Sequence, residues 1–305
     1  MDMKIVDVYY NQPIDSQKPL SACIGFFDGL HKGHQQLVEK ALEKKELTPA
    51  LITFDPDPIV VLRNNPDIKH IMTLEDKIEI AKELGIEVFI IFHSDKELLS
   101  QNPDDFVRNV LGALNVKHLV CGFDFRYGFR GAGNSSTLQE YPELFSVEVI
   151  EEVDYQKEKI STTRIVRYLK EGRVDEAEYL LSRPFTISGT IVSGNQKGRE
   201  IGFPTANLKA KPEYHEVKDG VYITEIKVKG TWYPAMTNVG HNLTFNTSDP
   251  LSIETYILDF NESIYNEEIQ LSFRKLLRPE IKFDTVAELI DQMKKDEEQT
   301  RQFYK

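Results

Sequence analysis

The sequence predicts two domains: an N-terminal α/β domain with a parallel sheet, and a small C-terminal antiparallel β-barrel that ends in a helix. The chain has 305 residues, which is long for one hydrophobic core. From Leu20 to about Val153, short apolar runs alternate with helical patterns, whereas from Phe185 onward apolar positions recur with a period near two. The period changes next to Arg183-Pro184, so we place the domains at residues 1–182 and 183–305.

The N-terminal half alternates buried strands with amphipathic helices. The expected strands are Ala22–Phe27, Ala50–Phe54, Val88–Phe92 and His118–Gly122, and the expected helices are His34–Glu46, Leu74–Leu84, Pro103–Leu114, Thr162–Lys170 and Val174–Leu181. Such alternation indicates parallel strands covered by helices. We therefore expect ligands to bind at the carboxyl ends of the strands.

The C-terminal half has the pattern of a small barrel. Its expected strands are Phe185–Val192, Gly220–Val228, Trp232–Val239, Ser252–Asp259 and Glu268–Leu276. So many antiparallel strands within about 100 residues favour a sheet that closes into a barrel. The last segment, Thr285–Phe303, is predicted to be a helix whose apolar stripe packs against the barrel rather than binding a partner. The stripe consists of Val286, Leu289, Ile290 and Met293.

Composition narrows the class of partner. Lys plus Arg number 37 and Asp plus Glu 49, and the resulting net charge of −12 argues against nucleic-acid binding. The two cysteines, Cys23 and Cys121, lie in apolar segments and form no disulfide framework, which favours a reducing, cytoplasmic environment. The N-terminus lacks the basic region of a signal peptide, and no apolar run reaches membrane-spanning length. We expect small-molecule substrates and predict no nucleic acid, membrane or protein partner.

A glycine-containing turn follows the first expected strand, with the sequence GFFDGLHKGH at residues 25–34. Gly29 and Gly33 allow the backbone to approach a ligand, and a helix beginning near His31 would direct its N–H groups toward an anion. His31 and His34 are three residues apart and share a helical face. The turn therefore indicates a site for nucleotide phosphates, the alternative being a plain strand-to-helix turn with two solvated histidines.

A second glycine-rich segment, GNQKGREIGFPTAN, occupies residues 194–207. Gly194, Gly198 and Gly202 precede a proline, so the loop can cradle phosphate through its backbone. Thr205 and Asn207 offer a hydroxyl and an amide oxygen, which are hard ligands suited to a magnesium ion bridging ATP phosphates. Taken alone, such a loop is more often a hairpin.

Together these segments resemble one family. The 25–34 turn is similar to that of HxGH nucleotidyltransferases, in the variant of prokaryotic bifunctional riboflavin kinase/FMN adenylyltransferases, and residues 194–207 resemble the riboflavin kinase signature GxxxGRxxGFPTAN. Residues 238–240, 253–260 and 278–283 also resemble that family. The resemblance covers nearly the whole chain. It implies a Rossmann-like nucleotidyltransferase domain before a riboflavin kinase barrel, with ATP, riboflavin, FMN and FAD as substrates and products and Mg²⁺ as cofactor.

For the N-terminal half, the resemblance implies that the FMN phosphate attacks the α-phosphorus of ATP and expels pyrophosphate. His31 and His34, as catalytic residues, and a helix N-terminus would stabilise the developing charge. The implied ATP-binding residues are Gly25, Phe26, Phe27, Asp28, Gly29, His31, Gly33, His34, Asp124, Arg126, Ser161, Thr162, Thr163 and Arg164. For Ser161 or Thr162, a helix N-cap is the alternative role.

For the C-terminal half, the resemblance implies that Glu254 is the base for the ribityl 5′-hydroxyl of riboflavin. A solvent-facing strand carboxylate is the alternative. Thr205 and Asn207 would hold magnesium, and a loop with Gly194, Lys197, Gly198 and Gly202 would cover the ATP phosphates. Asn238, Glu254 and Arg278 would bind the flavin, although Arg278 would equally suit an ion pair with a nearby carboxylate.

Three positions depart from the family pattern: Val166 where an arginine is usual, Asp57 where a histidine is usual, and Leu243 where a proline is usual. The charge of Asp57 would repel a triphosphate unless magnesium bridges them. Three hypotheses therefore remain open. The chain is a bifunctional enzyme that makes FMN and then FAD, a riboflavin kinase with a degenerate adenylyltransferase domain, or a non-catalytic flavin-binding regulatory protein.

Overall fold

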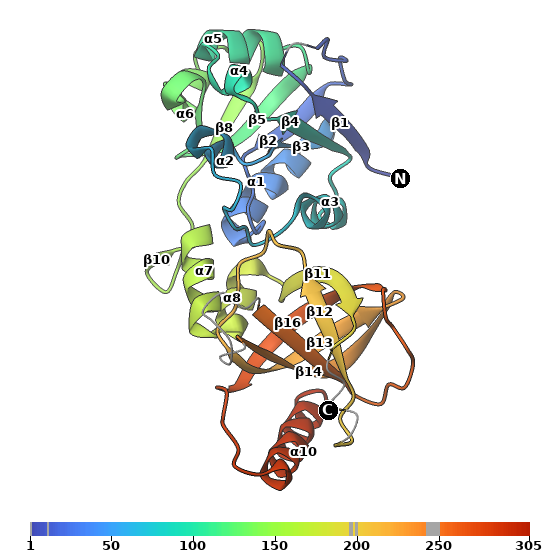
Figure 1. Cartoon of the computed structure of the whole chain (residues 1–305). Helices are drawn as coiled ribbons and strands as arrows, with labels where there is room; N and C mark the ends of the chain where they lie inside the picture. The colour runs from blue at the N-terminus through green and yellow to red at the C-terminus, as the bar shows by residue number, and fades with distance from the viewer. Residues whose placement is uncertain (1, 11, 195–197, 199–200, 242–250) are drawn as a thin grey trace. The chain divides into compact units, whose positions relative to one another are not determined.

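The computed structural model describes residues 2–10, 12–194, 198, 201–241 and 251–305, so Lys197 and Leu243 lie outside the described residues. The chain forms two compact units, Met1–Thr162 and Thr163–Lys305 (Figure 1). This division differs from the boundary at 182/183, because helix α8 (Val174–Leu181) packs on two strands of the second unit, β11 (Phe185–Val192) and β16 (Glu268–Arg278). The boundary at 182/183 stays a prediction about domain limits.

Unit 1 contains a six-stranded sheet in the order β1-β4-β3-β2-β5-β8, and all neighbouring strands are parallel. The strands are β1 Lys4–Val8, β2 Leu20–Ile24, β3 Thr48–Asp55, β4 Val88–His93, β5 Val116–Gly122 and β8 Ser146–Ile150. Every residue of β2 is buried. A central parallel strand is covered on both faces, which explains why β2 is apolar apart from Ser21, whose hydroxyl is hydrogen-bonded to His118 Nδ1 at 2.9 Å.

Helices cover both faces of this sheet (Figure 1). Side chains of α1 (Lys32–Glu43) and α3 (Leu74–Glu83) join one apolar cluster, and those of α4 (Lys96–Leu99), η1 (Phe106–Leu111) and α6 (Ser135–Leu138) join the other. Successive strand residues alternate between the clusters, as Ala22 and Cys23 do. The remaining elements are α2 Pro58–Arg63, α5 Pro103–Asp105, β6 Arg126–Tyr127, η2 Phe129–Gly131, β7 Gly133–Asn134, β9 Asp154–Tyr155 and β10 Glu158–Lys159.

Unit 2 is a closed antiparallel barrel in the order β11-β12-β15-β14-β13-β16, preceded by α7 (Thr162–Glu171) and α8. The other strands are β12 Thr205–Ala210, β13 Gly220–Val228, β14 Thr231–His241 and β15 Leu251–Ile257, and the chain ends in α10 Val286–Phe303. Inside the barrel, the Thr237 hydroxyl lies 2.8 Å from that of Thr224 and 2.9 Å from that of Thr255. These two hydrogen bonds give each of the three buried threonine hydroxyls a partner.

The predicted fold class is confirmed, and the differences are local. The expected strand Ala22–Phe27 is instead Leu20–Ile24, and Phe27 lies outside the β region with a φ of +58°. The expected helix Pro103–Leu114 is instead the short α5 followed by the π-helical η1. Strands β1, β8 and β12 of the sheet and the barrel escaped prediction, as did the two-residue strands β6, β7, β9 and β10.

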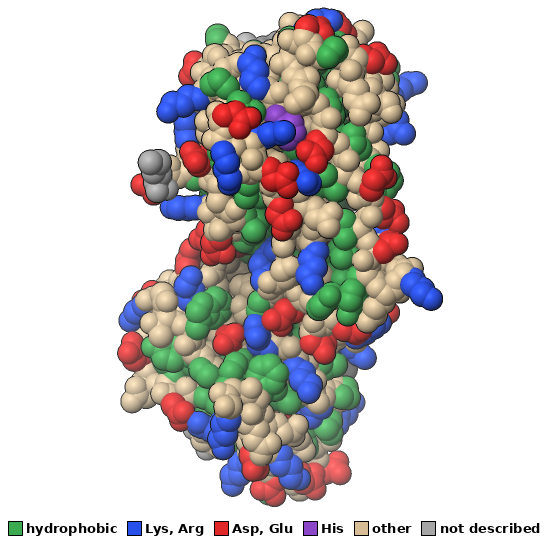
Figure 2. All heavy atoms as spheres, turned by 180° about the vertical axis from the view of Figure 1, so that it is seen from behind, with side chains coloured by type: hydrophobic (Ala, Val, Ile, Leu, Met, Phe, Trp, Pro, Cys, Tyr) green, Lys and Arg blue, Asp and Glu red, His purple; other side chains and the backbone are tan. Residues whose placement is uncertain are grey.

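The surface carries charges of both signs. On the face drawn in Figure 2, acidic and basic side chains are interspersed rather than separated by sign. Among the residues that the structure describes, no helix combines the length and apolar character needed to cross a membrane.

Candidate functional site

The turn between β2 and α1 has an unusual backbone. Phe27, Gly29 and Leu30 have φ values of +58°, +82° and +39°. The left-handed region is costly for residues other than glycine, and such strain persists only where packing enforces it. Phe27 and Leu30 are 1% and 0% exposed, so their buried side chains can hold the backbone in this shape. The turn is therefore a rigid entrance to α1.

His31 and His34 meet at the first turn of α1. His31 is the N-cap residue, and its Nδ1 accepts the backbone N–H of His34 at 3.3 Å. The rings stack with centroids 3.7 Å apart and an interplanar angle of 14°, so they share a face as their spacing predicts. Because Nδ1 accepts, the proton of a neutral His31 ring lies on Nε2. A Cβ on Gly33 would lie 3.2 Å from His31 Cε1, so glycine leaves room for the ring.

Asp28 connects this turn to two other segments of unit 1. Its carbonyl oxygen accepts a hydrogen bond from Thr162 Oγ1 at 3.1 Å, which brings the start of the predicted 161–164 segment to the turn. Its side-chain Oδ1 accepts the backbone N–H of Ile71 at 2.8 Å. Burial raises the pKa of the Asp28 carboxyl, an effect that His70 and the Ile71 N–H oppose.

The other predicted ATP-binding residues have varied surroundings. Asp124 follows β5, which pairs in parallel with β2, and its carboxylate lies 3.2 Å from Lys159 Nζ. Arg126 is exposed in β6. In unit 2, Thr163 is exposed, whereas Arg164 is buried in α7 and donates to Tyr168 Oη at 3.0 Å. Their roles in nucleotide binding stay predictions.

Sequence reasoning missed Lys77, which is 3% exposed on α3. Its Nζ donates to the carbonyl of Phe26 and, at 3.1 Å, to Thr53 Oγ1. Burial lowers the pKa of Lys77 to about 8. One signal could have found it: Lys77 stands four residues before Ala81, on the apolar face of the helix.

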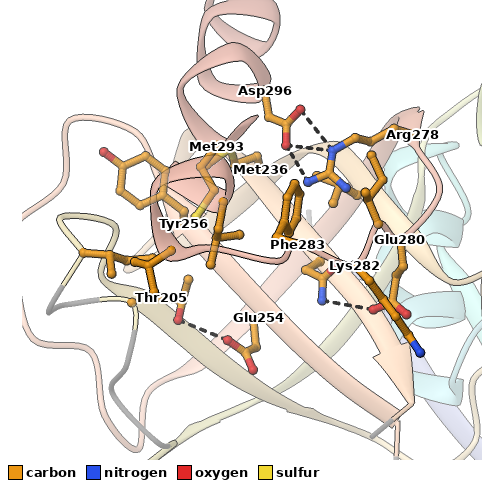
Figure 3. Close-up of a pocket in the computed structure, with 17 residues that line it drawn as sticks. Thr205, Met236, Glu254, Tyr256, Arg278, Glu280, Lys282, Phe283, Met293 and Asp296 are labelled. Carbon is orange, nitrogen blue, oxygen red and sulfur yellow. Dashed lines mark hydrogen bonds and ion pairs between the residues drawn. The ribbon is translucent and has the colours of Figure 1, made fainter. Parts of the chain in front are cut away.

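In unit 2, three polar residues lie in one row across neighbouring strands. Asn207 on β12 and Asn238 on β14 are both register partners of Glu254 on β15. Thr205 Oγ1 donates to Glu254 Oε2 at 3.3 Å (Figure 3). Ser252 Oγ donates to Glu254 Oε1 at 3.5 Å. The structure thus brings the two predicted magnesium ligands and the predicted base together on the outer face of the barrel.

Glu254 lies in a pocket of about 910 Å³. Apolar walls come from β14, the segment after β16, and α10, which contributes Val286, Leu289 and Met293. The apolar stripe of α10, expected to pack on the barrel, is therefore largely a wall of this pocket. Thr205, Asn238 and Glu254 supply polar groups. An apolar cavity with a few polar groups suits a flat ring carrying a polar chain.

At the other end of the pocket, Arg278 pairs with Asp296 (Figure 3). Arg278 Nε and Nη2 donate to the carboxylate at 2.8 to 3.2 Å, and Gln292 Nε2 donates to it at 2.8 Å. Asp296 is 2% exposed. Arg278 thus makes the ion pair that the sequence left open, while also lining the pocket. Asp296 was missed, although it continues the apolar stripe three residues after Met293.

Two glycines of the second motif allow close packing. A Cβ on Gly194 would lie 2.2 Å from Asn207 Nδ2, and one on Gly198 would lie 2.3 Å from the Phe203 carbonyl. Gly202 has a φ of +86°, which favours glycine. Three glycines therefore precede the Pro-Thr-Ala-Asn segment for two reasons. Gly194 and Gly198 leave room for neighbouring atoms, and Gly202 adopts a backbone conformation that other residues avoid.

The donors at Thr205 and Asn207 fit a magnesium ion. Among the described residues, no group of three or more His, Cys, Asp and Glu side chains could hold a metal ion. Magnesium bound with a nucleotide needs few protein ligands, because phosphates and water complete its oxygen shell. A hydroxyl and an amide oxygen two residues apart on one strand meet that requirement.

Comparisons with known proteins match both halves of the chain. The FAD synthetase family model matches residues 14–164, and the riboflavin kinase family model matches residues 181–304. The bifunctional riboflavin kinase/FMN adenylyltransferase of Listeria monocytogenes is 40% identical, over 97% of this chain and 98% of that protein. Its counterpart from Bacillus subtilis is 36% identical, over 92% and 91%.

A solved structure has the same fold along the chain. It is described as a macrolide-efflux protein from Streptococcus pneumoniae, is 33% identical, and covers 97% of this chain and 99% of its own with a TM-score of 0.87. With matches to both family models and to relatives along nearly its full length, this chain belongs to the family of bifunctional riboflavin kinase/FMN adenylyltransferases.

Proposed function

We propose that this bifunctional enzyme phosphorylates riboflavin in the pocket at Glu254 and adenylylates FMN at the turn before α1. Family membership supports the two activities, which together convert riboflavin into FMN and then FAD. The assignment of each activity to particular residues is supported by the way each unit gathers its motif.

In the kinase reaction, the ribityl 5′-hydroxyl attacks the γ-phosphorus of ATP, the bond from that phosphorus to the bridging oxygen breaks, and ADP leaves. Glu254 accepts the hydroxyl proton. Its hydrogen bonds from Thr205 and Ser252 favour one orientation of the carboxylate. This contact, inside a pocket of about 910 Å³, is the observation that carries the proposal for unit 2.

In the adenylyltransferase reaction, an oxygen of the FMN phosphate attacks the α-phosphorus of a second ATP. The bond between the α-phosphorus and the oxygen bridging to the β-phosphate breaks, and pyrophosphate leaves. Negative charge grows on the bridging oxygens, where His31 Nε2–H and the N–H groups at the start of α1 would stabilise it. The stacked His31–His34 pair at this helix N-terminus is the observation that carries the proposal for unit 1.

Magnesium would be held at Thr205 and Asn207 in unit 2, where it would neutralise the charge of the ATP phosphates. We also retain the prediction that the enzyme works in the cytoplasm. Cys23 and Cys121 are buried free thiols, which suits a reducing compartment. Burial raises the pKa of both thiols, that of Cys121 to about 12, so both are poor nucleophiles.

A product assay by liquid chromatography tests the proposal. Purified protein receives ATP and Mg²⁺ with riboflavin in one tube and FMN in another, and EDTA is added to duplicates. We expect FMN and FAD from riboflavin, FAD from FMN, and no product with EDTA. FMN alone from riboflavin would favour a kinase with a degenerate adenylyltransferase domain. No turnover in either tube would favour a flavin-binding regulatory protein.

A further inference from the structure

Four ionisable side chains gather beside the HxGH turn of unit 1. Asp28 lies in the turn, Asp57 is the N-cap residue of α2, His70 precedes α3, and Lys77 lies on α3. The side chains of Asp28, Asp57 and His70 are 9%, 16% and 16% exposed, and Lys77 is buried. Nothing in the reaction above uses His70 or Lys77, and Asp57 is a departure from the family pattern.

His70 stands between the two carboxylates. Its Nδ1 lies 3.9 Å from Asp28 Oδ2 and 3.9 Å from Asp57 Oδ2. Each carboxylate uses its other oxygen for a backbone N–H, that of Ile71 at 2.8 Å for Asp28 and that of Ile59 at 2.9 Å for Asp57. Both carboxylates are thus turned so that one oxygen accepts from the backbone and the second faces the same ring nitrogen.

The cluster also contacts the backbone of the turn through Phe26. The His70 ring lies against the Phe26 ring, with centroids 5.2 Å apart. Lys77 Nζ lies 4.2 Å from the centroid of that ring and donates to the Phe26 carbonyl. Lys77 thus binds the turn through the Phe26 carbonyl and also attracts Asp28 and Asp57 electrostatically, whereas His70 places one ring nitrogen 3.9 Å from each of these carboxylates.

This arrangement bears on a reaction between two anions. An aspartate beside the turn would oppose the phosphates of ATP and FMN, because like charges repel strongly in a partly buried site. Asp57 is that residue, and its second oxygen faces His70. We infer that His70 is a positioning residue of the adenylyltransferase, which holds the carboxylates of Asp57 and Asp28 toward itself and so keeps the Asp57 charge away from the substrates. The inference rests on the proposed assignment of adenylyl transfer to this turn.

A double-mutant cycle tests it. We would measure kcat and KM for ATP and for FMN in FAD formation by the parent, His70→Leu, Asp57→Asn and the double variant. We expect His70→Leu to raise KM about tenfold with a smaller change in kcat, and Asp57→Asn in that background to return KM most of the way to the parent value. His70→Asn, whose amide N–H lies near the place of Nδ1, should keep a KM close to that of the parent.

The kinase activity of the same protein is the internal control, since unit 2 is unchanged. A KM in His70→Leu within about twofold of the parent, or purely additive effects in the double variant, would overturn the inference. If His70→Leu lowers the midpoint of thermal unfolding, His70→Ser takes its place in the cycle, because it adds no apolar surface. FAD formation that survives in His31→Asn would instead refute the proposed site, whatever the His70 variants do.

Discussion

The two units build their sites in different ways. In unit 1 the chief residues are nearly consecutive, and a strained turn and a helix N-terminus arrange them. In unit 2, Thr205, Glu254 and Arg278 come from three different strands, and α10 forms a wall. A site made from one segment keeps its geometry as long as the backbone of that segment keeps its conformation. A site made from distant segments depends on the closure of the barrel and on the anchoring of α10.

Ionised groups also serve the two units differently. Unit 1 buries ionisable groups around one imidazole beside the turn proposed for adenylyl transfer, where their charges would affect the electrostatics of the reaction. Unit 2 buries the pair of Arg278 and Asp296 at the edge of its pocket, where it holds α10 on β16. Changes of charge should therefore alter substrate affinity in unit 1, and both stability and flavin affinity in unit 2.

The largest effect is expected at Glu254. Glu254→Gln should lower kcat for FMN formation by roughly 10²- to 10⁴-fold, the usual contribution of a general base, and leave FAD formation from FMN unchanged. Initial rates with riboflavin and with FMN check this. Glu268→Gln, which changes an exposed carboxylate on β16, is the matched control. Retention of the parent rate by Glu254→Gln would make Glu254 the ordinary strand carboxylate that the sequence left open.

Asp296→Asn should come next. Removing one partner of a buried ion pair costs roughly 3–5 kcal/mol, because the other charge loses its compensation. We expect unit 2 to unfold at a lower urea concentration and the KM for riboflavin to rise. Asp291→Asn, on an exposed position of the same helix, should change neither quantity. An unchanged urea midpoint for Asp296→Asn would mean that the pair does not anchor α10.

Lys77 should make unit 1 more stable as the pH rises. Burial lowers its pKa from 10.5 to about 8, so between these values the unfolded chain binds a proton that the folded chain does not. The free energy of unfolding should therefore increase over that range, by up to about 3 kcal/mol relative to Lys77→Met, and the difference should be constant below about pH 8. Urea unfolding of both proteins from about pH 7 to pH 10 measures this. If the free energies of unfolding of the two proteins changed with pH in the same way over this range, the predicted effect of Lys77 would be refuted.

The smallest effect is expected for a surface ion pair of unit 2. Arg301 contacts Asp259 through two hydrogen bonds of 2.7 Å, but the two side chains are 39% and 75% exposed. Solvent and salt screen such pairs, so Asp259→Asn should leave the unfolding midpoint within experimental error. A fall in the unfolding midpoint as large as that of Asp296→Asn would show that burial does not decide how much each of the two ion pairs contributes to stability.

The two units also differ in how much of each could be predicted from the sequence. The alternation of buried strands and helices revealed most of the sheet, but β1 escaped because only Val6 and Val8 of its five residues are buried. β12 escaped because it begins inside the polar motif that carries Thr205 and Asn207. Local motifs therefore revealed the His31–His34 pair more completely than the pocket of unit 2.

Contacts between distant segments were beyond such patterns. Asp296 meets Arg278 only because α10 returns to β16, and His70 meets Asp28 and Asp57 only because three loops converge. Sequence patterns singled out Arg278, Asp28 and Asp57 one by one, but nothing local distinguished Asp296 or His70 from ordinary surface residues. Burial, which depends on the assembled fold, turns them into candidates for function.

Complementation between two variants tests the division of labour most directly. His31→Asn keeps a residue able to cap α1 but removes the imidazole, and Glu254→Gln removes the base. Each variant alone, given riboflavin, ATP and Mg²⁺, should fail to make FAD: the first should stop at FMN, and the second should leave riboflavin unchanged. A mixture of the two should make FAD, because FMN released by one is adenylylated by the other. FAD from either variant alone at the parent rate, or no FAD from the mixture, would contradict the assignment of one activity to each unit.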